Sequence, residues 1–151
     1  MRLPALAFAA LLSGCAAAKA PAPPASTDAN APVQVVLDGT RWRITAEPLD
    51  PDAKDRPFED LLAFSSGRER QLLLDSFLKT RQFAPASYST PWGGEPKPGD
   101  PVVFEATLNN PSGESLQVEG RASRDAVWGQ IRLRREDWSL AAWRFRGTPA
   151  R

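Results

Sequence analysis

Carboxylates are the side chains that could carry acid–base chemistry in this sequence, because it contains no histidine. Serine–histidine and cysteine–histidine nucleophile pairs are therefore excluded, as are histidine-based zinc and iron sites. Glu59 and Asp60 are too close in sequence to act as a glycosidase pair, since adjacent residues of a strand point to opposite faces. No Gly-x-Ser-x-Gly elbow is present. We predict no catalytic residue, and a carboxylate-dependent hydrolase is the alternative that no motif supports.

Two further short patterns have the composition of ligand-binding loops. Asp50, Asp52 and Asp55 are spaced like the start of a calcium loop, but the fifth position is Lys54 and the sixth is not glycine. Gly93 and Gly94 lack the lysine and hydroxyl residue that follow in a phosphate loop. We interpret the first as a solvated acidic loop and the second as a turn, and we expect no metal ion and no cofactor.

The single cysteine has a specific sequence context. Arg2 precedes an apolar stretch over residues 3–12, which is too short to span a bilayer as a helix. The stretch ends in Leu12-Ser13-Gly14-Cys15, which resembles the lipobox of bacterial lipoprotein signal peptides. The resemblance implies cleavage between Gly14 and Cys15 and attachment of fatty acids such as palmitate to Cys15. The alternative is an ordinary secretory signal in which the cysteine occurs by chance.

The lipobox resemblance also implies a location. Residues 1–15 are expected to be a lipoprotein signal peptide, and two or more acyl chains give stable membrane anchoring. Ala16, rather than aspartate, follows the cysteine. This resembles the pattern sorted to the outer membrane of Gram-negative bacteria, so we expect a lipid-anchored protein of the cell envelope on the periplasmic face. Residues 16–32 are rich in alanine and proline and are predicted to be a disordered tether.

Residues 33–148 remain for a folded domain of ordinary single-domain length. They carry 16 basic and 17 acidic side chains once Arg2, Lys19, Arg151 and Asp28 are set aside, a net charge of −1. A nucleic-acid-binding domain normally has a strong basic excess, so we expect no nucleic-acid partner. With Cys15 acylated no cysteine remains for a disulfide, and packing alone must hold the fold.

Hydrophobic alternation and turn residues predict about eight strands. The second half of the domain contains four closely spaced strands, which can only be antiparallel neighbours because a parallel return needs a long crossover. One short helical turn over residues 77–82, capped by Asp75 or Ser76, interrupts the first half. We therefore predict an all-β fold, a single antiparallel up-and-down barrel. The strands are expected at residues 41–46, 58–64, 70–74, 88–92, 101–108, 115–122, 127–134 and 139–146.

The order of these segments resembles the small lipocalin-like, calycin-type barrels of bacterial lipoproteins. The resemblance rests on Leu37–Trp42, Asp60–Phe64, Phe83–Tyr88 and Trp143–Gly147. The opening Leu-x-Gly-Thr-x-Trp at residues 37–42 is also similar to the META domain of bacterial stress lipoproteins, which is our second choice. Both resemblances imply a domain of a bacterial lipoprotein, and the lack of catalytic motifs leads us to expect a non-catalytic function.

An eight-stranded barrel is wide enough to be filled by side chains or to hold one small ligand. We expect large apolar residues to be buried, Ile131 among them, and to line any ligand pocket. The ligand is predicted to be a small apolar molecule or a protein partner; the alternatives are simple core packing and an envelope structural, assembly or stress factor that acts through its surface. The pocket residues are predicted to be Trp42, Ile44, Phe64, Phe104, Trp143 and Phe145.

Four arginines alternate along the last two predicted strands: Arg132, Arg134, Arg144 and Arg146. Residues at this spacing share one face of the sheet. One interpretation is a solvated exterior in which Glu105, Glu119 and Glu136 pair with the arginines, at little energy per pair. The other is a surface that binds an anion.

Overall fold

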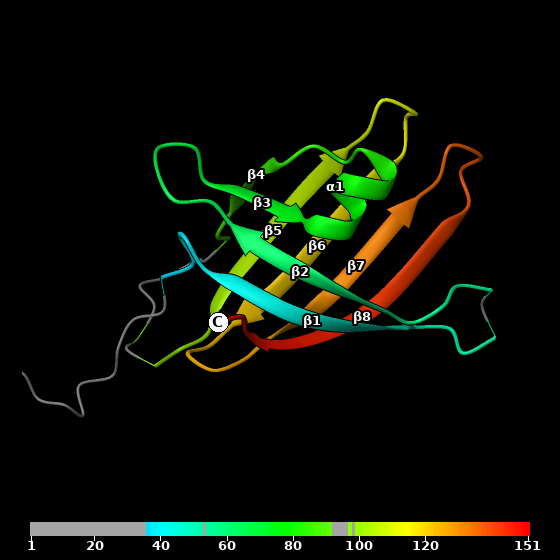
Figure 1. Cartoon of the computed structure of the whole chain (residues 1–151). Helices are drawn as coiled ribbons and strands as arrows, with labels where there is room; N and C mark the ends of the chain where they lie inside the picture. The colour runs from blue at the N-terminus through cyan, green and yellow to red at the C-terminus, as the bar shows by residue number, and fades with distance from the viewer. Residues whose placement is uncertain (1–35, 53, 92–96, 98) are drawn as a thin grey trace, which may run out of the picture. The chain divides into compact units, whose positions relative to one another are not determined.

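The computed structural model of this protein describes residues 36–52, 54–91, 97 and 99–151. The predicted signal peptide over residues 1–15, with Gly14 and Cys15, and the predicted tether over residues 16–32 lie outside the described residues, as does most of the glycine-rich loop near residue 94. The described chain forms eight strands and one short helix (Figure 1). The elements are β1 (Arg41–Pro48), β2 (Phe58–Phe64), β3 (Gln71–Leu74), α1 (Asp75–Arg81), β4 (Ala86–Ser89), β5 (Val102–Asn109), β6 (Ser115–Ala122), β7 (Val127–Arg134) and β8 (Leu140–Pro149).

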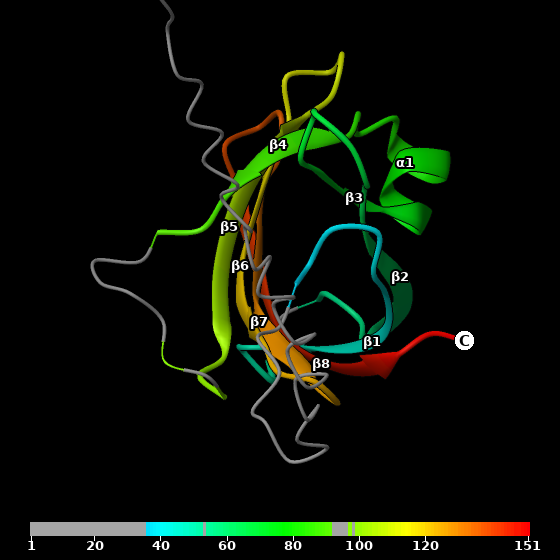
Figure 2. The same cartoon turned by 90° about the vertical axis from the view of Figure 1, so that its left-hand side faces the viewer.

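The eight strands form a closed antiparallel barrel in sequence order, which confirms the predicted fold class. Each strand pairs with the next, and β1 closes the ring by pairing with β8 from Trp42 opposite Pro149 to Pro48 opposite Trp143. Figure 2 shows the ring from one end, with β4 to β7 forming one side and β1 and β2 the other. Closure pairs every strand on both sides and so removes exposed sheet edges.

Local turn chemistry sets the long hairpins of the second half. Between β5 and β6, the Asn110 carboxamide oxygen accepts from the Glu114 backbone N–H at 2.9 Å, and Gly113 supplies the positive φ of 82°. Between β7 and β8, the Asp137 carboxylate accepts from the Ser139 N–H at 3.0 Å. Such side-chain-to-backbone bonds fix short loops and hence strand register.

The inward residues of all eight strands form one hydrophobic cluster. The six predicted pocket residues and Ile131 are each 5% exposed or less, which confirms the predicted burial. Aromatic rings link the strands edge to face: the Phe64 ring lies 5.0 Å from the Phe104 ring and 5.1 Å from the Tyr88 ring. Edge-to-face pairs of this kind add about 0.5–1.5 kcal/mol beyond area burial.

Two glycines make room for two buried phenylalanine rings. Gly120 and Gly129 lie opposite each other on β6 and β7, with Phe104 of β5 opposite Gly120 and Phe145 of β8 opposite Gly129. A Cβ atom on Gly120 would lie 2.7 Å from the Phe104 ring, and one on Gly129 would lie 2.9 Å from the Phe145 ring. The two phenylalanine rings therefore occupy the space that side chains would take at the glycines.

The helix starts earlier than predicted, and its cap differs. α1 includes Asp75 and Ser76, so neither residue caps it from outside. Instead Asp60, on β2, accepts from the Ser76 N–H at 2.8 Å and from the Ser76 hydroxyl at 2.6 Å. A carboxylate at a helix N-terminus satisfies free N–H groups and opposes the helix dipole. The prediction placed the cap within the local sequence, whereas the fold supplies it from a neighbouring strand.

The fourth and eighth strands also differ from prediction. β4 covers Ala86–Ser89, two residues earlier than the predicted start at residue 88, and it ends before Pro91, which has no N–H to donate to a ladder. Residue 92, the predicted end, lies outside the described residues. β8 extends to Pro149, past the expected end of the domain at residue 148, because β1 offers partners as far as Trp42. Pairing is shortest around β4, which shares two register pairs with β3 and two with β5.

Candidate functional site

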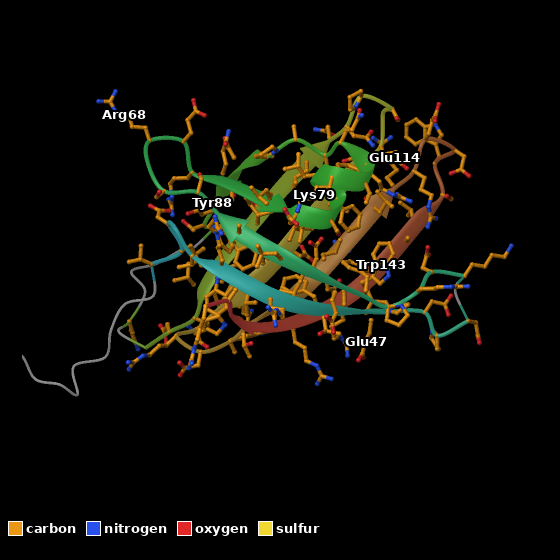
Figure 3. All side chains as sticks on the ribbon, in the orientation of Figure 1. Glu47, Arg68, Lys79, Tyr88, Glu114 and Trp143 are labelled. Carbon is orange, nitrogen blue, oxygen red and sulfur yellow. The ribbon has the colours of Figure 1, made fainter. Side chains whose placement is uncertain are left out.

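The six residues predicted to line an interior pocket lie in the core, but not at one place. Trp42 and Trp143 belong to the paired strands β1 and β8, yet Trp42 lies opposite Pro149 and Trp143 opposite Pro48. Six strand residues separate the two positions, which corresponds to about 20 Å. Figure 3 shows Trp143 and Tyr88 at opposite ends of the barrel, and the Tyr88 ring packs on Phe64, near the start of β1. The structure therefore does not bring the two tryptophans together in one pocket at the same end of the barrel.

Both tryptophans use their indole N–H groups within the fold. The Trp42 Nε1 donates to the Thr40 hydroxyl at 3.0 Å, and the Trp143 Nε1 donates to the Arg56 carbonyl at 3.1 Å. Phe58 also packs against Trp143, with 5.4 Å between ring centroids. A ligand pocket inside the barrel remains a prediction.

Two grooves on the outer surface meet at Trp128. The first, of about 440 Å³, lies over β1, β8 and β7 and includes Thr45, Glu47, Arg144 and Arg146. The second, of about 350 Å³, lies over β5, β6 and β7 and includes Glu105, Glu119 and Arg121. Trp128, Gly129 and Gln130 line both grooves. Of the six predicted pocket residues, Phe145 reaches the first groove and Phe104 the second, each beside a glycine.

The register of the sheet places two arginines beside Trp128. Arg121 of β6 and Arg146 of β8 are its cross-strand partners on either side. Directly paired residues on one face have Cβ atoms about 4.5–5.5 Å apart. In the next row, Gln130 lies opposite Arg144, which lies opposite Glu47. Trp128 is 39% exposed, and its cross-strand partners on both sides are arginines.

The outer wall formed by β6, β7, β8 and β1 is strongly basic. Its outward positions carry seven arginines and two glutamates: Arg41, Arg43, Arg121, Arg132, Arg134, Arg144 and Arg146, with Glu47 and Glu119. The alternating arginines of the last two strands thus share one wall, as their spacing predicted. This concentration of charge contrasts with the nearly neutral domain as a whole.

Only part of this positive charge is neutralised locally. Arg132 pairs with Glu119 at 2.9 Å, and Arg146 lies 3.7 Å from Glu47, which Figure 3 shows on the outer side of β1. Arg134 stacks over the Trp138 ring at 4.6 Å instead. Neither Arg121 nor Arg144 forms an ion pair with any residue in the described ranges. Among the described residues, these two guanidinium groups therefore have no acidic partner.

A second polar cluster lies at the end of the barrel where β1 begins. The Tyr88 hydroxyl donates a short hydrogen bond to the Asp38 carboxylate, and the Arg70 Nε donates to the Asp38 carboxylate at 3.4 Å. The Arg70 guanidinium also lies over the Tyr88 ring at 4.8 Å. The Tyr88 hydrogen bond lowers the pKa of Asp38, while burial and then the Asp38 bond raise the pKa of Tyr88. The cluster ties the segment before β1 to β4 and to Arg70, which directly precedes β3.

Asp60, the buried acidic residue of the barrel, has a structural role. Within the part of the chain that the structure describes, Asp60 is the one charged side chain classed as buried, and its two oxygens accept from Ser76. Across residues 36–151, less the few positions left out, no group of three or more cysteine, aspartate and glutamate residues is placed to hold a metal ion. Of the described helices, none is long and apolar enough to cross a membrane.

Trp128 and Arg121 are candidate site residues that the sequence patterns did not predict. A signal for Trp128 was present, because Val127, Ile131 and Leu133 fix the inward phase of this strand and leave Trp128 outward. A tryptophan that points outward among polar residues is unusual, so the strand pattern could have identified Trp128 as a candidate site residue. The proximity of Trp128 to Arg121 and Arg146 could be recognised only from the register of three strands.

Comparison with protein-family models gave no match, and neither the curated proteins nor the solved structures gave one.

Proposed function

We propose that this protein is a lipid-anchored, non-catalytic binding module of the bacterial cell envelope, which binds its ligand on the outer surface of the barrel. The anchor and the envelope location rest on the lipobox resemblance at Leu12–Cys15 and on Ala16 after it. The lipocalin-like resemblance is compatible with a binding role. A surface role was one of the alternatives that the sequence left open.

One observation favours the outer surface over the barrel interior as the binding site. The six residues expected to line an interior pocket are each 5% exposed or less and pack within one hydrophobic cluster. The grooves around Trp128, by contrast, are open, polar at the rim and within the volume range of about 300–1,000 Å³ typical of ligand sites. Surface binding requires no displacement of core side chains.

The test is whether an apolar ligand stabilises the barrel. The purified full-length lipoprotein in a non-ionic detergent would be melted with fatty acids, isoprenoids and porphyrins at increasing concentration. A ligand that binds the folded state alone raises the melting temperature as its concentration exceeds its dissociation constant. We expect no rise. A concentration-dependent rise that Ile44→Ala abolishes and Trp128→Ala leaves unchanged would overturn the surface proposal and favour an interior ligand.

A further inference from the structure

We propose that the grooves around Trp128 bind a linear acidic glycan, a chain of sugars that carry carboxylate groups. This inference rests on the proposed function and names the class of ligand for its outer surface. It is carried by the combination of an exposed tryptophan, nearby arginines of which Arg121 and Arg144 have no acidic partner among the described residues, and carboxylates that line the same grooves.

The exposed ring of Trp128 provides a stacking surface. One face of a sugar ring is formed by C–H bonds, which are apolar and slightly positive. The π face of an indole is apolar and slightly negative, so the two surfaces attract each other and exclude water. Trp128 is 39% exposed, and it lines both grooves. A ligand that stacks on it can therefore continue into the groove on either side, which fits a chain better than a single ring.

The arginines select for acidic sugars. Guanidinium groups bind carboxylates with two parallel hydrogen bonds. Arg121 lies on one side of Trp128, with Arg146 and Arg144 on the other, and Arg121 and Arg144 have no ion-pair partner among the described side chains. The contact of Arg146 with Glu47 is 3.7 Å long between side chains that are 81% and 65% exposed, so it competes weakly with a ligand.

The acidic groups of the grooves argue against denser polyanions. Glu47 lines the first groove, and Glu105 and Glu119 line the second. These carboxylates can accept hydrogen bonds from sugar hydroxyl groups, and they repel a polyanion whose charges are more closely spaced than those of a chain of acidic sugars and which has no hydroxyl groups to donate. Gln130 and Thr45 add further polar partners. An acidic glycan has both features that this mixture requires, spaced carboxylates and many hydroxyl donors.

The experiment compares three probes on the intact lipoprotein in a non-ionic detergent. They are a short oligogalacturonate, the same oligosaccharide with its carboxylates fully methyl-esterified, and a polyglutamate of matched charge. Binding is measured by calorimetry and by tryptophan fluorescence. We expect the oligogalacturonate to bind most tightly, with an affinity that falls as salt is raised.

Matched variants locate the binding. Trp128→Ala and Arg144→Gln are each expected to weaken oligogalacturonate binding about tenfold, the loss of one stacking or charge-assisted contact. Trp138→Ala removes a tryptophan that is 74% exposed but lies outside both grooves, and Arg41→Gln removes an arginine of the same wall that lines neither groove. Both controls should bind as the wild type does. All four positions are on the surface, and unchanged melting temperatures would show that each variant is folded.

Any one of four results would overturn the glycan proposal. They are equal binding of the esterified probe, equal or tighter binding of polyglutamate, oligogalacturonate binding that Trp128→Ala leaves unchanged, and the absence of oligogalacturonate binding. None of these results involves stabilisation by an apolar ligand, which is the separate observation that would overturn the surface function itself.

Discussion

At the scale of single residues, the polar side chains of the barrel ends have structural roles that depend on charge. Asp60 accepts two hydrogen bonds from Ser76 and so fixes the start of α1. Asp38 accepts from Tyr88 and from Arg70, which joins the segment before β1 to β4 and to the residue that directly precedes β3. The lowered pKa of Asp38 and the raised pKa of Tyr88 make the second cluster sensitive to pH at both extremes.

The Tyr88→Phe variant tests this cluster. Because the pKa of Asp38 is lowered in the folded state, its contribution is present above the unfolded value of about 3.9 and is lost as the pH falls through the folded value. Because the pKa of Tyr88 is raised, its contribution is present below about 10 and is lost as the pH rises through the folded value. Tyr88→Phe should lower the melting temperature near neutral pH, and the gap to wild type should narrow at both extremes.

The measurement is thermal unfolding followed by circular dichroism across the pH range. Ser89→Ala is the control, since the Ser89 hydroxyl bonds Glu105 on the exposed side of the same strand. A gap between Tyr88→Phe and wild type that stays constant with pH would contradict the assignment of the two pKa shifts to this hydrogen bond.

At the scale of elements, close packing of rings on backbone shapes the β5–β8 wall. Phe104, Gly120, Gly129 and Phe145 form a row of inward positions across four neighbouring strands. Gly120 and Gly129 have no positive φ, so their role is to leave space rather than to permit a turn. The same two glycines lie beneath the outer grooves, so the packing inside this wall and the surface outside it depend on each other.

Gly129→Ala is therefore expected to destabilise the barrel severely. A Cβ atom there would lie 2.1 Å from the Glu119 carbonyl oxygen and 2.6 Å from the Gly120 Cα, both of which are backbone atoms. Backbone strain from overpacking should cost about 3 kcal/mol or more. Gly113→Ala is the comparison, because a Cβ atom there would have no neighbour within 4 Å and only the positive φ of 82° is unfavourable.

Urea unfolding of both variants would measure the difference. For Gly113→Ala we expect a loss of about 1 kcal/mol. If Gly129→Ala cost no more than Gly113→Ala, the strands β6 and β7 would not pack as closely as described.

At the scale of the whole molecule, charge distribution matters more than net charge. The domain is nearly neutral, yet one wall of the barrel carries seven arginines against two glutamates. Fields of this kind attract acidic ligands at short range even where the total charge is small. The proposed tether over residues 16–32 would reach about 50 Å if extended at about 3.1 Å per residue, which would let the barrel meet ligands away from the membrane.

The Cys15→Ser variant tests the proposed anchor. Loss of the acylated cysteine should release the protein from membranes, because stable anchoring needs the acyl chains. Cell fractionation and labelling with a radioactive fatty acid would measure this, and the wild type should carry label in the membrane fraction. Ser13→Ala keeps a small residue at its position in the lipobox and serves as the matched control. A Cys15→Ser protein that remains labelled and membrane-bound would refute the lipobox assignment.

The sequence by itself determined the strands and their inward faces. Alternation along β1 places Trp42, Ile44 and Ala46 inside, and the short loops after residues 109 and 134 allow antiparallel neighbours only. Both features are local, because the side-chain period and the turn residues lie within a few positions of each other. For that reason the barrel class and the buried residues could be predicted without coordinates.

Tertiary structure decided everything that depends on register between distant strands. Pairing of β1 with β8 sets Trp42 and Trp143 far apart, although the sequence suggested one pocket. The helix cap comes from Asp60 on β2 rather than from the adjacent residues. Trp128 acquires Arg121 and Arg146 only through the register of β6, β7 and β8. Register is fixed by the packing of the whole core, since a slip of one residue would move every inward side chain to the outer face.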